Sequence, residues 1–138
     1  MARQIIYKTP KHIAEIATAG KYLNELLLLT ANNAKAGVTL LELEEQAQQF
    51  LDQKNLTWSF KWFHGFPANL CLSVNDCIVH GIPDETVLQD GDLLKIDAWV
   101  TYKKWIADSA VSLVIWWKDK SSEWYELYTK TKSALDTG

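Results

Sequence analysis

The spacing of apolar residues changes near residue 58, and this change limits the folds that the chain can adopt. Before it, the segments Pro10 to Ala34 and Leu40 to Lys54 carry apolar residues at helical intervals. Thr9 precedes the proline that opens the first segment, which is a helix-start pattern. Thr39 is followed three residues later by Glu42, the pattern of a capping box. The first part of the chain therefore predicts two helices.

Beyond residue 58 the chain predicts strands. Residues 69–81 are rich in β-forming side chains, and the turn-rich stretch 82–92 follows them. Residues 93–100 and 106–115 then read as the two strands of a hairpin. A third helix is expected to begin within residues 123–138. Helices followed by strands and a further helix predict an α+β fold with an antiparallel sheet.

Composition restricts the class of protein. With 138 residues, the chain is long enough for one domain or for part of a larger one. Its net charge is −3 and no basic patch dominates, so specific nucleic-acid binding is not expected. No apolar run approaches the length of a membrane span, and the first residues lack the apolar region of a signal peptide. Cys71 and Cys77 are expected to be reduced thiols in a cytoplasmic protein.

Two aspartates bracket the tip of the predicted hairpin. If the turn is centred between Tyr102 and Lys103, Asp97 and Asp108 lie directly opposite each other on one face of the sheet. Their Cβ atoms would then be about 4.5–5.5 Å apart. Carboxylates this close repel each other unless a cation or a proton lies between them. From spacing alone, two interpretations stay open: one edge of a dimetal site, or a pair of surface aspartates, which is the commoner arrangement.

The run from Ser59 to Ala110 carries further motifs. It contains "FHGFP", then "SVND" followed by "HGIPD", then "LQDGD" and "KID", with the second aspartate eleven residues after Asp97. These motifs, with "TP" and "AGVTLLELE" in the helical part, resemble the N-terminal half of type I methionine aminopeptidases, which are pita-bread metallopeptidases. The resemblance implies half of a pita-bread fold, in which two helices pack on an antiparallel sheet. It also implies that residues 1–138 are the N-terminal portion of a single domain whose C-terminal half is missing.

The resemblance implies a role for each matching polar residue. Asp97 matches a carboxylate that binds one metal ion through both oxygens, and Asp108 matches one that bridges two. The implied cofactors are two divalent metal ions, with Co²⁺, Mn²⁺, Fe²⁺ and Zn²⁺ as candidates. His80 matches the catalytic histidine that contacts the substrate near the scissile amide, a place that suits imidazole. The implied substrate is the N-terminal methionine of nascent polypeptides, which puts the reaction near the ribosome.

Three less polar residues match the substrate pocket of the family. Phe63, Phe66 and Cys71 correspond to positions that line the pocket for the methionine side chain, where soft apolar groups suit a thioether. Ordinary core packing is the alternative interpretation for these three. His64 lies beside them as a supporting residue, whereas His12 on the first helix is expected to be a surface residue.

The chain also departs from the family. A complete member supplies three more metal ligands, a histidine and two glutamates, together with a glutamate base. After Asp108 there is no histidine, and the only glutamates are Glu123 and Glu126. The 138-residue chain is therefore expected to be inactive by itself. Two alternatives remain: a non-catalytic binding module with the pita-bread fold, and a proline-directed peptidase of the same fold.

Tryptophan is the second departure. The chain has seven tryptophans and only six glycines, whereas glycine averages about 7% of residues in globular proteins. Trp62 and Trp105 stand where the family pattern has glycine. Either the tryptophans form a genuine aromatic cluster, or a codon read as tryptophan is glycine in the source, as UGA is in some bacteria. The excess of tryptophan, the shortage of glycine and the match to family glycine sites favour the second hypothesis. It covers six positions: Trp62, Trp99, Trp105, Trp116, Trp117 and Trp124. Trp58 fits it less clearly.

Overall fold

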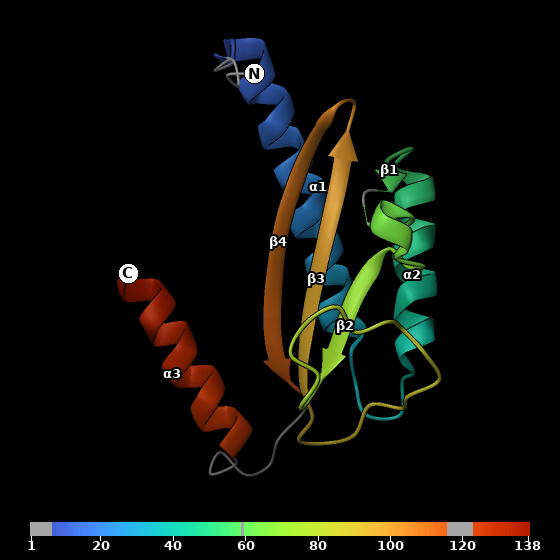
Figure 1. Ribbon diagram of the computed structural model, residues 1–138, viewed down its shortest axis with the longest axis vertical. Helices are drawn as coiled ribbons and strands as arrows, with labels where there is room; N and C mark the ends of the chain where they lie inside the picture. The colour runs from blue at the N-terminus through green and yellow to red at the C-terminus, as the bar shows by residue number, and fades with distance from the viewer. Residues whose placement is uncertain (1–6, 59, 116–122) are drawn as a thin grey trace.

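The computed structural model describes residues 7–58, 60–115 and 123–138, which form an α+β arrangement (Figure 1). Its helices are α1 (Pro10–Asn33), α2 (Leu40–Gln53) and α3 (Glu123–Thr137), and a short 3-10 turn, η1, spans Phe63–Gly65. Its strands are β1 (Thr57–Trp58), β2 (Leu70–Val74), β3 (Leu93–Tyr102) and β4 (Trp105–Val114). All three predicted helices and the predicted hairpin are therefore confirmed.

The first two helices begin where the sequence predicts. The Thr9 hydroxyl accepts a hydrogen bond of 3.2 Å from the His12 amide, and His12 Nδ1 accepts one of 3.4 Å from the Thr9 amide. The Thr39 hydroxyl likewise accepts from the Glu42 amide at 3.1 Å, while the Glu42 carboxylate accepts from the Thr39 amide at 2.7 Å. Each pair satisfies amide groups that the first helical turn leaves without partners.

The sheet is built around β3. Strand β4 runs antiparallel along one edge of β3, from Leu93↔Val114 to Tyr102↔Trp105. Strand β2 pairs with β3 from Leu70↔Ala98 to Val74↔Leu94, and the two-residue β1 pairs near the end of β3, at Thr57↔Thr101. Every pairing is antiparallel, as predicted. The strand-rich stretch 69–81 forms a strand only over its first part, since residues 75–81 leave the sheet as a loop.

One face of the sheet carries the core. On β3 the side chains of Leu94, Ile96, Ala98 and Val100 are fully buried, and leucines of α1 and α2 pack in the same cluster. Figure 1 shows α1 crossing one face of the β3–β4 hairpin and α2 lying beside β2. Burying each Leu or Ile side chain stabilises a fold by about 1.5–3 kcal/mol. The predicted packing of two helices on an antiparallel sheet is confirmed.

The register of the hairpin differs from the predicted one. Tyr102 pairs with Trp105, so the tip consists of Lys103 and Lys104. Consequently Asp97 faces Ala110, and Asp108 faces Trp99. The expectation that the two aspartates are direct partners is wrong. They are diagonal neighbours on adjacent strands, and such residues lie about 7–8 Å apart, with their Cβ atoms somewhat closer. Because the shift is two residues, a full side-chain period, both aspartates still lie on the same face.

Candidate active site

The face of the sheet opposite the core carries the predicted site residues. Side chains alternate along a strand, so the neighbours of the buried β3 residues point away from the helices. Cys71 on β2 pairs directly with Asp97 on β3, and Trp99 pairs directly with Asp108 on β4. Three strands therefore bring a thiol, two carboxylates and an indole to one surface.

Asp97 lies in an environment that disfavours its charge. Partial burial, and next the negative charge of Asp108, raise the pKa of its carboxyl group. The nearby His80 ring and a hydrogen bond from the Ala98 amide act in the opposite direction on the same pKa. A carboxylate that is partly desolvated and has a second carboxylate nearby is suited to hold a cation, because a cation relieves both penalties.

An apolar cavity of about 400 Å³ opens on the face of the sheet that carries Asp97. It is lined by Phe60, Phe63, His64, Gly65, Phe66, Pro67, Cys71, His80, Ile82 and Trp99. The four predicted substrate-contacting residues, Phe63, Phe66, Cys71 and His80, are all in this set, and so is His64. Asp97 lies beside the cavity wall. Its pairing partner on β2, Cys71, belongs to the wall, and so does Trp99, two residues further along β3 on the same face. The structure therefore brings the predicted pocket and the predicted carboxylates together.

Cys71 is a neutral wall group. Burial, and then the charges of Asp97 and Glu44, raise the pKa of its thiol to about 12. A thiol with that pKa stays protonated at neutral pH. Since metal binding requires the thiolate, Cys71 suits an apolar pocket better than a ligand set.

Aromatic rings make up much of the pocket wall. The Trp99 ring stacks on Phe60 with centroids 4.4 Å apart and planes 16° apart, and it meets the edge of Phe63 at 5.2 Å. The sequence motifs do not assign Phe60 or Trp99 to the pocket. For Trp99 a signal was available, because it lies two residues after Asp97 and therefore on the same face.

His80 is held by the loop that follows β2. It is exposed and has a φ of 57°. Its neighbour Gly81 accepts a hydrogen bond of 2.9 Å from the Leu72 amide and donates one of 3.0 Å to the Ser73 hydroxyl. A Cβ atom on Gly81 would lie 2.1 Å from the Leu72 carbonyl oxygen, so only glycine allows this approach. In the "HG" of the motif, Gly81 is held against β2, and this position of Gly81 places the imidazole of His80 at the cavity.

The described residues supply part of a metal site. Oxygen donors such as Asp97 and Asp108 suit hard and borderline divalent cations. Within residues 7–58, 60–115 and 123–138, however, no three histidine, cysteine, aspartate or glutamate side chains are grouped closely enough to hold a metal ion. Of the two later glutamates, Glu126 forms an ion pair with Lys130 on the same helix. The two aspartates fit a divalent cation chemically, as an incomplete ligand set.

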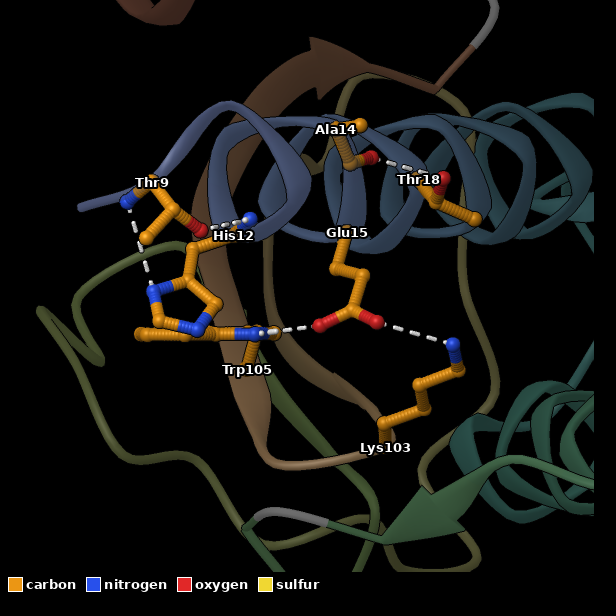
Figure 2. Close-up of polar contacts among 7 residues, drawn as sticks. All are labelled: Thr9, His12, Ala14, Glu15, Thr18, Lys103 and Trp105. Carbon is orange, nitrogen blue, oxygen red and sulfur yellow. Dashed lines mark hydrogen bonds and ion pairs between the residues drawn. The ribbon is translucent and has the colours of Figure 1, made fainter.

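His12 and Trp105 take part in a contact between α1 and the hairpin (Figure 2). His12, expected to be a surface residue, is partly exposed, and its ring packs on Trp105 with centroids 5.0 Å apart. Trp105 is not at a position that needs positive φ. It lies within β4, and the tip residue with positive φ is Lys103, at 57°.

The other tryptophans of the codon hypothesis lie in different settings. Trp62 has a φ of 72°, which favours glycine, and Trp124 lies in the first turn of α3. Trp116 and Trp117 lie outside the described residues. The reading of the codons stays a prediction at all six positions.

Two helices packed on one face of an antiparallel sheet, with the paired carboxylates and the apolar pocket on the other face, form an α+β arrangement of the pita-bread class. The model of metallopeptidase family M24 matches residues 14–138, and the chain belongs to that family. It is 40% identical, over 110 residues, to a methionine aminopeptidase of Mycoplasma capricolum, an alignment that covers 80% of this chain and 44% of that protein.

Solved structures agree with this assignment. The methionine aminopeptidase of Thermotoga maritima superposes with a TM-score of 0.88 at 27% identity, covering 97% of this chain and 53% of that one. Aminopeptidase P of Escherichia coli, with a TM-score of 0.66 at 21% identity over 78% of this chain and 23% of that one, shares the fold. The chain spans about half the length of the curated relatives that it matches.

Proposed function

We propose that the chain forms part of a methionyl aminopeptidase, which removes the initiator methionine from nascent proteins by hydrolysis assisted by two divalent metal ions. The observation that carries the proposal is the adjacency of the Asp97–Asp108 pair to the cavity lined by Phe63, Phe66, Cys71 and His80. The methionine aminopeptidases among its relatives support the same activity.

The pocket would select the side chain of the first residue. Aromatic rings from Phe60, Phe63 and Trp99 and the neutral thiol of Cys71 form an apolar, polarizable wall. Sulfur atoms make favourable contacts with aromatic rings, so a thioether fits this wall better than a charged or hydroxyl side chain does. The wall is therefore suited to methionine.

The polar residues would orient the peptide bond. With the methionine side chain in the pocket, the N-terminal ammonium and the scissile amide would lie toward Asp97 and His80. His80 can donate a hydrogen bond to the amide oxygen as negative charge develops there. Asp97 and Asp108 would hold the metal ions, which, when bound, activate water and polarise the carbonyl group.

The 138-residue chain by itself is expected to be inactive. Two carboxylates without further ligands hold a divalent ion weakly, and the described residues offer no group of three ligands. The purified chain, supplied with Mn²⁺ or Co²⁺ and a Met-Ala-Ser peptide, should show no turnover. Hydrolysis at rates typical of an aminopeptidase would overturn this expectation.

Peptide selectivity tests the function itself. Binding of non-cleaved peptides to the purified chain, followed by saturation-transfer NMR, should favour Met-Ala-Ser over Ala-Ala-Ser and Ser-Ala-Ser. Equal binding of the three peptides would contradict a methionine pocket. Reading the coding region beyond codon 138 in the same frame, for a histidine and two glutamates, would separate the enzyme from a binding module.

Two alternatives remain. A non-catalytic binding module is favoured by the incomplete ligand set. Such a module would bind peptides, and the coding region downstream would contain no codons for further metal ligands. A proline-directed peptidase is favoured by the shared fold with aminopeptidase P, and would prefer peptides with proline at the second position, such as Ala-Pro-Ser.

The cellular setting is part of the proposal. The described helices include none that is long and apolar enough to cross a bilayer. Cys71 and Cys77 are free thiols, which supports a reducing compartment such as the cytoplasm. Initiator methionines become available on nascent chains, so we place the activity near the ribosome.

A further inference from the structure

The backbone of Trp62 has a conformation that tryptophan rarely adopts. Its φ is 72° and its ψ is −4°, in the left-handed region. Six described residues other than glycine have positive φ: Asn55, Trp62, His64, Asn75, His80 and Lys103. Asparagine and histidine are enriched in this region, whereas a bulky side chain there is an outlier. Trp62 is therefore the least expected member of the set.

The loop imposes this conformation. The Trp62 amide donates a hydrogen bond of 2.7 Å to the Phe66 carbonyl, and the Trp62 carbonyl accepts one of 3.2 Å from the Gly65 amide. These bonds close the loop that places Phe63 and Phe66 in the pocket wall. A change of φ at residue 62 would break them, so the left-handed conformation belongs to the pocket's architecture.

The indole of Trp62 contributes little in return. The residue is 67% exposed, and its ring makes no hydrogen bond or ring contact with any residue that the structure describes. Two other tryptophans contrast with it. Trp99 stacks on Phe60, and Trp105 donates a hydrogen bond to Glu15. Neither has positive φ. Of these three tryptophans, only Trp62 combines an unfavourable backbone conformation with a ring that makes none of these contacts.

We propose that position 62 is occupied by glycine in the protein as its own cell makes it, the codon being UGA read as glycine. Glycine adopts positive φ without a steric penalty, so the same loop hydrogen bonds would form without strain. The low glycine count and high tryptophan count of the sequence agree with this reading. The inference concerns the residue at one position and does not depend on peptidase activity.

The gene and the native protein give the first test. The codon for residue 62 should be UGA. Trypsin cleaves after Lys61, so the peptide spanning residues 62–95 begins at the position in question. Mass spectrometry of that peptide from the source cells should find glycine as its first residue. A UGG codon, or tryptophan in the native peptide, overturns the proposal.

Stability of the recombinant chain gives the second test. W62G should unfold at a higher denaturant concentration than both the tryptophan form and W62A, because alanine removes the indole yet keeps the Cβ atom that resists positive φ. W105G, at a strand position with negative φ, should unfold at a lower concentration. A W62G midpoint no higher than that of W62A would contradict the geometric argument.

Discussion

The indole nitrogen of Trp105 donates a hydrogen bond of 2.9 Å to Glu15, which lies 90 residues earlier in the chain (Figure 2). The other carboxylate oxygen of Glu15 accepts a bond of 2.9 Å from Lys103 Nζ. His12, which lies on α1 like Glu15, packs its ring on the Trp105 ring. Together these contacts fasten the first turns of α1 to the tip of the hairpin whose strands carry Asp97 and Asp108.

Substitutions at Trp105 should rank by the contacts that they remove. W105F keeps an aromatic ring against His12 but loses the N–H donor, so it should lower the melting temperature modestly. W105G also removes the ring and adds backbone freedom within a strand, so it should lower the melting temperature further. Differential scanning calorimetry provides the comparison. Equal melting temperatures for W105F and W105G would show that the ring contact is unimportant.

Glu15 should make stability depend on pH in acid. Hydrogen bonds from Lys103, and then from Trp105, lower the pKa of its carboxyl group. A carboxylate with a lowered pKa stabilises the fold above its unfolded pKa of about 4.3, and this contribution is lost as pH falls through the folded pKa. The wild-type chain should therefore exceed E15Q in melting temperature at pH 7, with the difference shrinking below pH of about 4. A difference independent of pH would mean that the charge of Glu15 has no role.

Glu44 on α2 should be a strong determinant of stability. Its carboxylate accepts hydrogen bonds from the Asn69 amide at 2.7 Å, the Asn69 side chain at 2.6 Å and the Leu70 amide at 3.0 Å. Removing it leaves three donors at the start of β2 without that partner. E44A should lower the free energy of unfolding by about 3 kcal/mol, measured by urea denaturation. E45A, one residue along the same helix and exposed, is the control and should change it by less than about 0.5 kcal/mol.

Replacement by alanine should change the stability of the fold in opposite directions at two glycines, Gly81 and Gly20. At Gly81 a Cβ atom would lie 2.1 Å from the Leu72 carbonyl oxygen and 2.9 Å from Ser73 Cα, both backbone atoms. G81A should therefore destabilise the fold by about 2–3 kcal/mol and displace the His80 loop. At Gly20, inside α1, a Cβ atom would meet nothing within 4 Å. G20A should stabilise by about 1 kcal/mol, the difference in helix propensity.

Chemical denaturation and NMR check this pair of substitutions. The amide signals of residues 72–73 and 80–82 should shift in G81A and stay unchanged in G20A. If G81A were as stable as the wild-type chain, the close approach of residue 81 to β2 would not exist in solution.

Asp108 should lower the stability of the metal-free fold and strengthen the binding of a divalent metal ion. Its charge contributes to the raised pKa of Asp97, so D108N should slightly raise the melting temperature in EDTA. The same substitution should weaken Mn²⁺ binding by at least about tenfold, since even changes behind a direct ligand cost that much. Electron paramagnetic resonance of free Mn²⁺ measures the affinity. D90N, at an exposed aspartate in another loop, should leave both quantities unchanged.

The sequence by itself determined the local features of this protein. The capping patterns at Thr9 and Thr39 depend on side chains within three residues of each other, and the faces of β3 follow from alternation along one strand. It therefore predicted the helix starts, the hairpin and the shared face of Asp97 and Asp108. The residues to expect at a pocket were implied by the resemblance to the family and not by these local patterns. The family motifs supplied the functional interpretation of those residues.

Only the tertiary structure decided the relations between distant segments. The hairpin register depends on whether the tip is Lys103–Lys104 or one residue earlier, and both choices keep the same faces toward core and solvent. The wall formed by Phe60 and Trp99, and the bond from Trp105 to Glu15, join segments far apart in the chain. No local pattern encodes such contacts, because they form only when the helices and the sheet pack around one core.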